Sequence, residues 1–481
     1  MAIGEAGPRS ARSRSRPERL EETMRARLGR ECVYVPSCRL GLYVALRHWC
    51  PPGGRVLMSP VNDDVIFFVV LAAGLRPVQA PLNALDASID IDAVPEEAWG
   101  SLSAVLTTNL YGNPDPAPRL RARCDALGIP LFEDAAHAIG SEAGGRPVGA
   151  WGDASVFSLS KHAGAQAGGI LSLADPDLGD ALRRTCDGLL TPRRTASELA
   201  YAVRPYAEAA VRGLGLRRAA WAAMGLLGLT ERDGIRMPLR PERLARAAGV
   251  APDLAAHDPW VRVDMHAYRL RSGPLRLRRI RRGLGRLDEV LEASREGTEL
   301  LLSTRWARPR AGGGTQPLFR VPLFVADRDA AIAALARRGI VVGYLYDPPL
   351  DDYAGKEFTD PSPAPGAARW FARHALPVDP LRAREAVEAL ERSGARPAEL
   401  PAELTRPRRA PAGGPRPPGT GPARTPCSRT PTSSCSARAC RPFSGWGSGS
   451  SPPATTPRTP SARAPPPSPP CGCSPASPRP R

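Results

Sequence analysis

Two lysines, Lys161 and Lys356, stand out because every other residue among the 66 lysines and arginines is an arginine. A guanidinium stays protonated and cannot condense with a carbonyl group, whereas a desolvated lysine amine can. Lys161 lies in Phe157-Ser-Leu-Ser-Lys-His162, ahead of a glycine-rich segment, while Lys356 lies in a polar stretch that we expect to form a loop. We therefore predict that Lys161 is the reactive lysine; codon bias in a GC-rich genome is the alternative explanation of the scarcity.

Two acids follow a short apolar run upstream of Lys161. Gly128-Ile-Pro-Leu-Phe132 leads directly into Glu133 and Asp134. Such a run is typical of a buried parallel strand, and open α/β sheets place ligand groups at the carboxyl ends of their strands. Asp134 is therefore predicted to be functional, with the N-cap of a following helix as the alternative. If a helix begins here, His137 lies on the same face as Asp134.

These segments, taken in order, resemble a known family. Glu133-Asp-Ala-Ala-His137, the segment 146–153 and Val156-Phe-Ser-Leu-Ser-Lys161 are similar to consecutive motifs of the DegT/StrS aminotransferases. Members of this family use pyridoxal phosphate to aminate keto sugars on nucleotide carriers. The likeness continues in segments 37–46, 105–112, 319–329, 338–340 and 375–378, and it covers roughly Glu31 to Leu400.

The resemblance implies a fold-type I aminotransferase with pyridoxal 5'-phosphate as its cofactor. Lys161 would bind the aldehyde of the cofactor and later move a proton between substrate and cofactor carbons. Asp134 would pair with the pyridine nitrogen and keep it protonated, because a nearby carboxylate favours the charged form. His137 would lie close to the ring, where the family has a glutamine or histidine; a purely structural histidine is the alternative.

The phosphate group of the cofactor needs backbone donors and hydroxyl groups. Ser37, Cys38 and Arg39 open an apolar helical pattern, and a helix N-terminus attracts anions. Ser158 and Ser160 would supply hydroxyls; plain helix capping is the alternative for Ser37. The chain departs from the family at Cys38, where glycine is usual. It also lacks an aromatic residue in the segment 59–65, so we expect His137 or an aliphatic side chain to cover the ring.

Short apolar runs predict strands, and the longer periodic runs between them predict helices. Strands are expected near Arg55–Met58, Pro77–Gln79, Ala104–Thr107, Ile129–Phe132, Ala154–Phe157 and Gly169–Ser172, and helices near Val65–Ala73, Ala117–Leu127 and Leu178–Cys186. This alternation predicts a large α/β domain with a mainly parallel sheet covered on both faces. A later pattern of strand, helix, strand and helix at 318–324, 329–337, 340–344 and 381–391 predicts a smaller α+β domain.

We divide the chain into a flexible arm at 1–30, a large cofactor-binding domain at 31–240 with a helical insertion at 196–232, a small domain at 241–400 and a tail at 401–481. The residues from Thr405 onward include no Leu, Ile, Val, Asp, Glu or Lys, so we expect this tail to be disordered. The tail also carries twelve arginines and no acid, and therefore accounts for most of the net charge of +18. Translation of GC-rich DNA in a shifted frame is our preferred explanation of its composition.

The sequence predicts an aminotransferase that acts on a nucleotide-linked keto sugar, with glutamate or glutamine as the donor and a homodimer as the assembly. The cysteines show no metal-ligand spacing, and the basic stretch Arg269–Arg286 lacks the interleaved aromatics of a nucleic-acid site. The start of the chain has no signal-peptide pattern, which favours a cytoplasmic location. For residues 198–230 a packed helical hairpin is favoured over a membrane-surface helix. A pyridoxal-phosphate lyase or dehydratase, and a non-catalytic regulatory protein with a decayed site, are the alternative functions.

Overall fold

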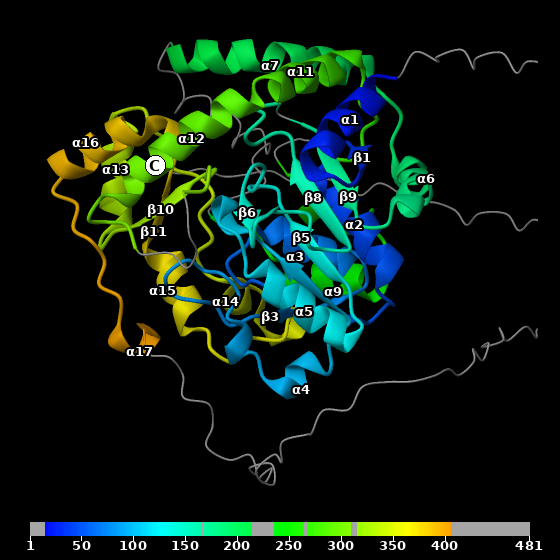
Figure 1. The fold of residues 1–481 in the computed structure, drawn as a ribbon, viewed down its shortest axis with the longest axis horizontal. Coiled ribbons are helices and arrows are strands. Elements are labelled where there is room, and N and C mark those ends of the chain that lie inside the picture. Colours follow the sequence, from blue (N-terminus) through cyan, green and yellow to red (C-terminus); the bar gives the residue numbers. More distant parts are fainter. Residues whose placement is uncertain (1–14, 166, 214–234, 264–266, 309–314, 406–481) are drawn as a thin grey trace, which may run out of the picture. The chain divides into compact units, whose positions relative to one another are not determined.

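A seven-stranded sheet forms the centre of the computed structural model, which describes residues 15–165, 167–213, 235–263, 267–308 and 315–405 (Figure 1). The strand order is β1-β9-β8-β5-β4-β2-β3. β2 pairs in parallel with β3 and β4, β4 with β5, and β5 with β8, whereas β9 is antiparallel to β8 and β1. The strands are β1 (Glu31–Val35), β2 (Arg55–Met58), β3 (Arg76–Gln79), β4 (Ala104–Thr107), β5 (Leu131–Asp134), β8 (Ala154–Ser158) and β9 (Gly169–Leu173).

Helices cover both faces of this sheet, which confirms the expected α/β layering. One core cluster joins the sheet to apolar residues of α2 (Cys38–Trp49), α3 (Asp64–Ala72), α6 (Gly179–Leu189), α9 (Pro241–Gly249) and α10 (Asp258–Val261). A second cluster joins it to α4 (Glu96–Trp99), α5 (Ala117–Leu127) and α15 (Gly366–His374). Because both faces are buried, most strand residues are apolar, although β3 and β5 end in polar side chains.

A smaller group of elements forms its own core near the C-terminal end of the described chain. The antiparallel strands β10 (Val321–Phe324) and β11 (Ala375–Val378) pack with the end of α12 (Leu287–Leu302), α13 (Arg328–Arg337) and α16 (Ala383–Arg392). This is the expected α+β pattern, with one exception. The strand predicted at 340–344 is wrong, because these residues form neither helix nor strand. Main-chain oxygens at Tyr344 and Tyr346 instead accept hydrogen bonds from the side chains of Tyr111 and Arg236.

Other parts of the chain also pack differently from the sequence prediction. Arg16–Leu28, inside the expected flexible arm, forms helix α1, which has a capping box at Ser15 and buries Leu20 and Met24. Residues 241–261, assigned to the small domain, include α9 and α10 and contribute to the core of the large sheet. Lys356, expected in a loop, lies in helix α14 (Leu350–Phe358).

The remaining elements surround these two cores. α7 (Thr195–Gly213), which lies in the expected insertion, packs against α11 (Pro274–Gly285), and α11 also packs against α1 (Figure 1). The rest of the predicted hairpin, residues 214–232, and the tail from 406 lie outside the described residues. Short elements complete the chain: β6 (Glu142–Ala143), β7 (Arg146–Pro147), α17 (Ala402–Thr405) and 3-10 turns at Ile91–Ala93, Leu110–Gly112, Pro176–Leu178 and Pro380–Arg382.

Candidate active site

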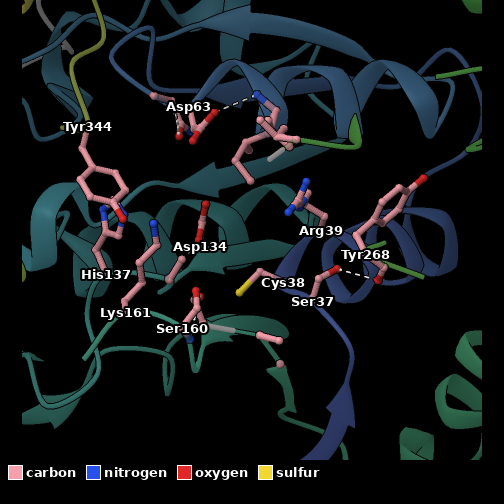
Figure 2. A pocket seen from close by; sticks show the side chains of 18 of the residues that line it. Ser37, Cys38, Arg39, Asp63, Asp134, His137, Ser160, Lys161, Tyr268 and Tyr344 are labelled. Carbon is pink, nitrogen blue, oxygen red and sulfur yellow. Dashed lines mark hydrogen bonds between the residues drawn. The ribbon is translucent and has the colours of Figure 1, made fainter. Parts of the chain in front are cut away.

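The carboxyl ends of the parallel strands open into a cavity of about 560 Å³. The chain leaves β2, β4, β5 and β8 at the same sheet edge, because parallel strands all end on one side. Each exit places polar residues on the cavity wall: Asn62 and Asp63 after β2, Thr108 after β4, Asp134 at the end of β5, and Ser158, Ser160 and Lys161 at and after the end of β8. The cavity therefore brings together all eight site residues predicted from the sequence, including Ser37, Cys38, Arg39 and His137 (Figure 2).

At one end of the cavity helix α2 begins. Ser37 is its N-cap, and the Ser37 hydroxyl accepts a hydrogen bond from the Leu40 amide at 3.3 Å while it donates to the main-chain oxygen of Tyr268 at 3.1 Å. The strand β9 passes very close to this helix start, since a Cβ atom at Gly169 would lie 2.9 Å from the Cys38 nitrogen. A glycine is needed there. The first turn of α2 thus presents the positive end of a helix dipole to the cavity.

The predicted hydroxyl donors lie at the same end. The hydroxyl groups of Ser158 and Ser160 are 2.8 Å apart, at the end of β8 and on the turn that follows it. Burial, with a further contribution from the nearby Asp134 carboxyl, raises the pKa of the Cys38 thiol well above its usual range. Cys38 therefore stays a neutral thiol, and it does not add negative charge to a part of the cavity suited to anions.

Asp134 lies in the middle of the cavity wall, as the last residue of β5 (Figure 2). Its carboxylate accepts a hydrogen bond from the Ala136 amide at 3.0 Å, and its main-chain oxygen accepts one from the Asn109 side chain. The residues directly after Asp134 form turns and not an α-helix, so the helix-cap alternative and the helical placement of His137 are both wrong. Burial raises the pKa of Asp134 to about 7, and the Asp63 carboxyl adds to this effect.

The neighbouring acid, Glu133, has a different environment. Its carboxylate is fully buried and accepts hydrogen bonds from the amides of Gly149, Trp151 and Gly152 and from the Ser155 hydroxyl. Successive residues of a strand point to opposite faces, so only one of two adjacent acids can reach the cavity. The Glu133 side chain orders the turn before β8, and the Asp134 side chain faces the cavity, where it can contact a bound molecule.

Aromatic rings surround the amine of Lys161 at the other end of the cavity. The Lys161 Nζ atom lies 3.9 Å from the ring centroid of Tyr344 and 5.4 Å from that of Phe319. The His137 ring stacks on Phe319 at 4.9 Å between centroids and meets the Tyr344 ring edge to face at 5.4 Å. Burial, reinforced by the charge of Lys161, holds the pKa of His137 well below its usual value. His137 is therefore neutral beside the lysine.

Tyr344 has a strained backbone, which is held by a hydrogen bond from a residue that follows strand β4 of the large sheet. Its φ of 63° lies in the left-handed region, which an aromatic residue adopts only when its surroundings require it. The Tyr111 hydroxyl donates to the Tyr344 main-chain oxygen at 2.7 Å, and the main-chain oxygen of Tyr111 accepts from the Phe319 amide at 2.8 Å. A single residue, Tyr111, thus orders both aromatic rings that face the lysine.

Arginines contribute a positive part of the wall. Arg39 donates to the main-chain oxygen of Val261, and its guanidinium lies 5.6 Å from the ring centroid of Tyr268. Arg276 pairs with the nearly buried Glu198 at 2.8 Å. Arg204 lines the cavity as well. Two arginines of the basic stretch, Arg269 and Arg271, form ion pairs with Asp258 and Asp187, whereas Arg278, Arg281, Arg282 and Arg286 are exposed on or next to α11.

Sequence reasoning missed Tyr344, Tyr268 and Asp63, which line the cavity from distant segments. The missing aromatic residue in 59–65 was the one signal that another ring should be sought. Lys356 has no part in this cavity; it lies in α14, where its main-chain oxygen accepts from Arg76 at 2.7 Å.

Two further features are absent from the part of the chain that the structure describes. No group of three or more His, Cys, Asp and Glu side chains there is arranged to hold a metal ion. None of the described helices is both long and apolar enough to cross a membrane.

Residues 11–201 match the DegT/DnrJ/EryC1/StrS aminotransferase family. One curated relative, the GDP-perosamine synthase of Vibrio cholerae, is 29% identical over 145 residues, which are 30% of this chain and 40% of that protein. The chain matches only about two fifths of the length of such curated relatives.

Solved structures extend the likeness over most of the chain. The aminotransferase TlmJ of Streptoalloteichus hindustanus aligns with a TM-score of 0.56 and 20% identity, over 79% of this chain and 90% of its own. The GDP-4-keto-6-deoxy-D-mannose-3-dehydratase of E. coli, solved with bound hydrated pyridoxal phosphate, aligns with a TM-score of 0.55 and 16% identity, over 78% and 91%. At these identities the alignments show a shared fold, and they confirm the predicted fold class.

Proposed function

We propose that the chain is a pyridoxal-phosphate-dependent aminotransferase, a proposal supported by the match of residues 11–201 to the DegT/DnrJ/EryC1/StrS aminotransferase family. It transfers an amino group from glutamate or glutamine to a nucleotide-linked keto sugar. The observation that carries the proposal is the arrangement of Lys161, Asp134 and the start of α2 around one cavity (Figure 2). These are the three groups that a phosphorylated pyridine aldehyde requires.

The donor set fits this cofactor. The start of α2 with the hydroxyls of Ser158 and Ser160 suits a phosphate group, and the carboxyl of Asp134 suits a protonated pyridine nitrogen. A buried carboxyl whose pKa is raised to about 7 is one that gains from a cationic partner. When bound, the cofactor supplies an electron sink for the substrate carbon that loses a proton.

The residues of the chain supply the rest. Lys161 would hold the cofactor through its amine and, once released by the amino donor, move a proton at the substrate carbon. Asp134 would keep the pyridine nitrogen protonated, and the neutral His137 would lie beside the ring without repelling the lysine. Tyr344 and Phe319 would exclude water from the amine, which strengthens every charge interaction around it.

The arginines that line the cavity support the choice of substrate. Arg39 and Arg204 would place positive charge near an incoming pyrophosphate. The names of curated relatives support the same class, since one makes GDP-perosamine and another acts on a UDP-linked dehydro sugar. We extend the proposal to a homodimer in the cytoplasm on the strength of the family resemblance, with the exposed arginines of α11 as a further basic surface for the nucleotide.

A dehydratase is the second candidate, because one structural neighbour carries out that reaction on a GDP-linked keto sugar. Dehydratases of this family have histidine at the position of the lysine, so Lys161 favours amino transfer.

The test uses the full chain mixed with pyridoxal phosphate. We expect a visible absorption band, a borohydride-fixed adduct on the peptide that contains Lys161, and amino transfer from glutamate or glutamine to keto sugars linked to UDP, GDP or dTDP. An adduct on Lys356, or transfer to small free keto acids with equal efficiency, would contradict the proposal.

A further inference from the structure

A buried arginine, Arg236, joins two segments that line the cavity but does not line the cavity itself. The Arg236 side chain is only 9% exposed, and its guanidinium donates to three main-chain oxygens. The acceptors are Asn62 at 2.6 Å from Nη1, Tyr346 at 2.9 Å from Nη2 and Pro348 at 2.9 Å from Nε. Main-chain acceptors define where the backbone runs, so these bonds fix two chain segments relative to each other.

The two segments lie far apart in the sequence, and both line the cavity. The first is the turn after β2, which contributes Asn62 and Asp63 to the cavity wall. The second, residues 343–348, has no helix or strand and contributes Tyr344 and Tyr346. With no strand ladder to hold it, the second segment depends on such side-chain bonds for its position.

Neighbouring contacts reinforce the same junction. The Met237 amide donates to the Asp64 carboxylate at 2.7 Å, and the Tyr353 hydroxyl donates to the Met237 main-chain oxygen at 2.7 Å. The Leu350 amide donates to the Pro60 oxygen at 2.8 Å. Arg236 is thus the central member of a buried junction between the turn after β2 and residues 343–350.

We infer that Arg236 is a positioning residue of the proposed aminotransferase, which holds the ring of Tyr344 against the Lys161 amine by fixing residues 343–348 to the turn after β2. The inference rests on the proposed function for its kinetic consequence. Its structural part, that Arg236 orders these two segments, stands independently.

The chain offers a matched control in Arg30. The guanidinium of Arg30 likewise donates only to main-chain oxygens, those of Leu173 at 3.2 Å, Gly149 at 2.6 Å, Gly152 at 2.6 Å and Asp153 at 3.4 Å. None of these residues lines the cavity. Lysine has a single charged nitrogen and cannot span three carbonyls, so Arg236→Lys and Arg30→Lys remove the same kind of junction from two places.

The experiment measures three quantities in both full-length variants and the wild type. Hydrogen exchange follows the amides of residues 61–65, 343–347 and 350. Titration with pyridoxal phosphate gives its Kd and the circular dichroism of the bound chromophore, and kinetics give kcat and KM for amino transfer. We expect Arg236→Lys to speed exchange in both segments, to change the chromophore signal, and to lower kcat about tenfold because a small misplacement of reacting groups is costly. The Kd should change less than about threefold, since the phosphate end is untouched. Arg30→Lys should leave all of these unchanged, although its melting temperature should also fall.

Equal exchange in the two variants would overturn the structural part of the inference. Faster exchange with kcat and chromophore signal equal to those of Arg30→Lys would overturn the positioning role. If the wild type itself transfers no amino group, the proposed function fails, and the exchange and titration results still decide whether Arg236 orders the two segments.

Discussion

The two walls of the cavity are built in different ways. The wall that carries Asp134, Ser158 and Lys161 sits at the ends of hydrogen-bonded strands, within 28 residues of sequence. The second wall carries Tyr344, and the Phe319 ring lies 5.0 Å from the Tyr344 ring between centroids; both residues lie in segments without helix or strand. Tyr111 and Arg236 hold that wall through individual hydrogen bonds. The reactive groups thus rest on a rigid scaffold, whereas the rings facing them can shift by small changes at a few contacts.

We expect the largest loss of activity from a substitution in the rigid wall. Lys161→Ala removes the amine that holds the cofactor and moves the proton, so we expect amino transfer to fall by at least about a thousandfold. The borohydride-fixed adduct should disappear in the same variant. Lys356→Ala is the control, because Lys356 lies in α14 outside the cavity, and it should behave as the wild type. Retained turnover in Lys161→Ala would remove the central residue of the proposal.

Asp134→Asn should have the second largest effect. The amide cannot stabilise a protonated pyridine nitrogen, so we expect the cofactor to bind but kcat to fall about a hundredfold or more, the scale of losing one preorganised charge interaction. Glu133→Gln is the control that distinguishes loss of the Asp134 charge from damage to strand β5. Glu133 holds the turn 149–155, so its variant should lose thermal stability first and turnover only in proportion. Similar stability losses with normal turnover in both variants would make Asp134 merely structural.

The difference between the walls also explains what the sequence could predict. Asp134, Ser158 and Lys161 follow apolar runs that predict strands, and parallel strands must end at one edge, so their meeting follows from local pattern. Tyr344 could not be found in this way. Its position depends on a left-handed backbone and on hydrogen bonds from residues more than a hundred positions away. The same limit explains the wrong strand at 340–344: these residues form no ladder, and the Tyr344 main-chain oxygen accepts from the Tyr111 hydroxyl.

The aromatic wall should give a smaller effect. Tyr344→Leu removes the ring whose centroid lies 3.9 Å from the Lys161 amine, and we expect kcat to fall about tenfold, within the range of a desolvated cation and ring contact. Tyr344→Phe keeps the ring and should stay within about twofold of the wild type. Steady-state kinetics with saturating donor measure both. If the two variants lose activity equally, the hydroxyl of Tyr344 and not its ring face is the important group.

The smallest effect concerns stability and pH in the cofactor-free protein. Burial raises the pKa of Asp134 to about 7, whereas an unfolded aspartate titrates near 3.8. A carboxyl whose pKa rises on folding contributes fully below its unfolded pKa and loses that contribution as the pH rises through its folded pKa. Melting temperatures measured from about pH 5 to about pH 8 should therefore fall for the wild type relative to Asp134→Asn, which has no proton to lose there. The buried histidines titrate in both proteins, so the difference between the two curves isolates Asp134.

Bound pyridoxal phosphate should shrink or reverse this difference in melting temperature, because a protonated pyridine nitrogen pairs with the carboxylate and not with the amide. Parallel curves with and without cofactor would show that Asp134 does not meet the ring, and the rigid wall would then lose its second functional group.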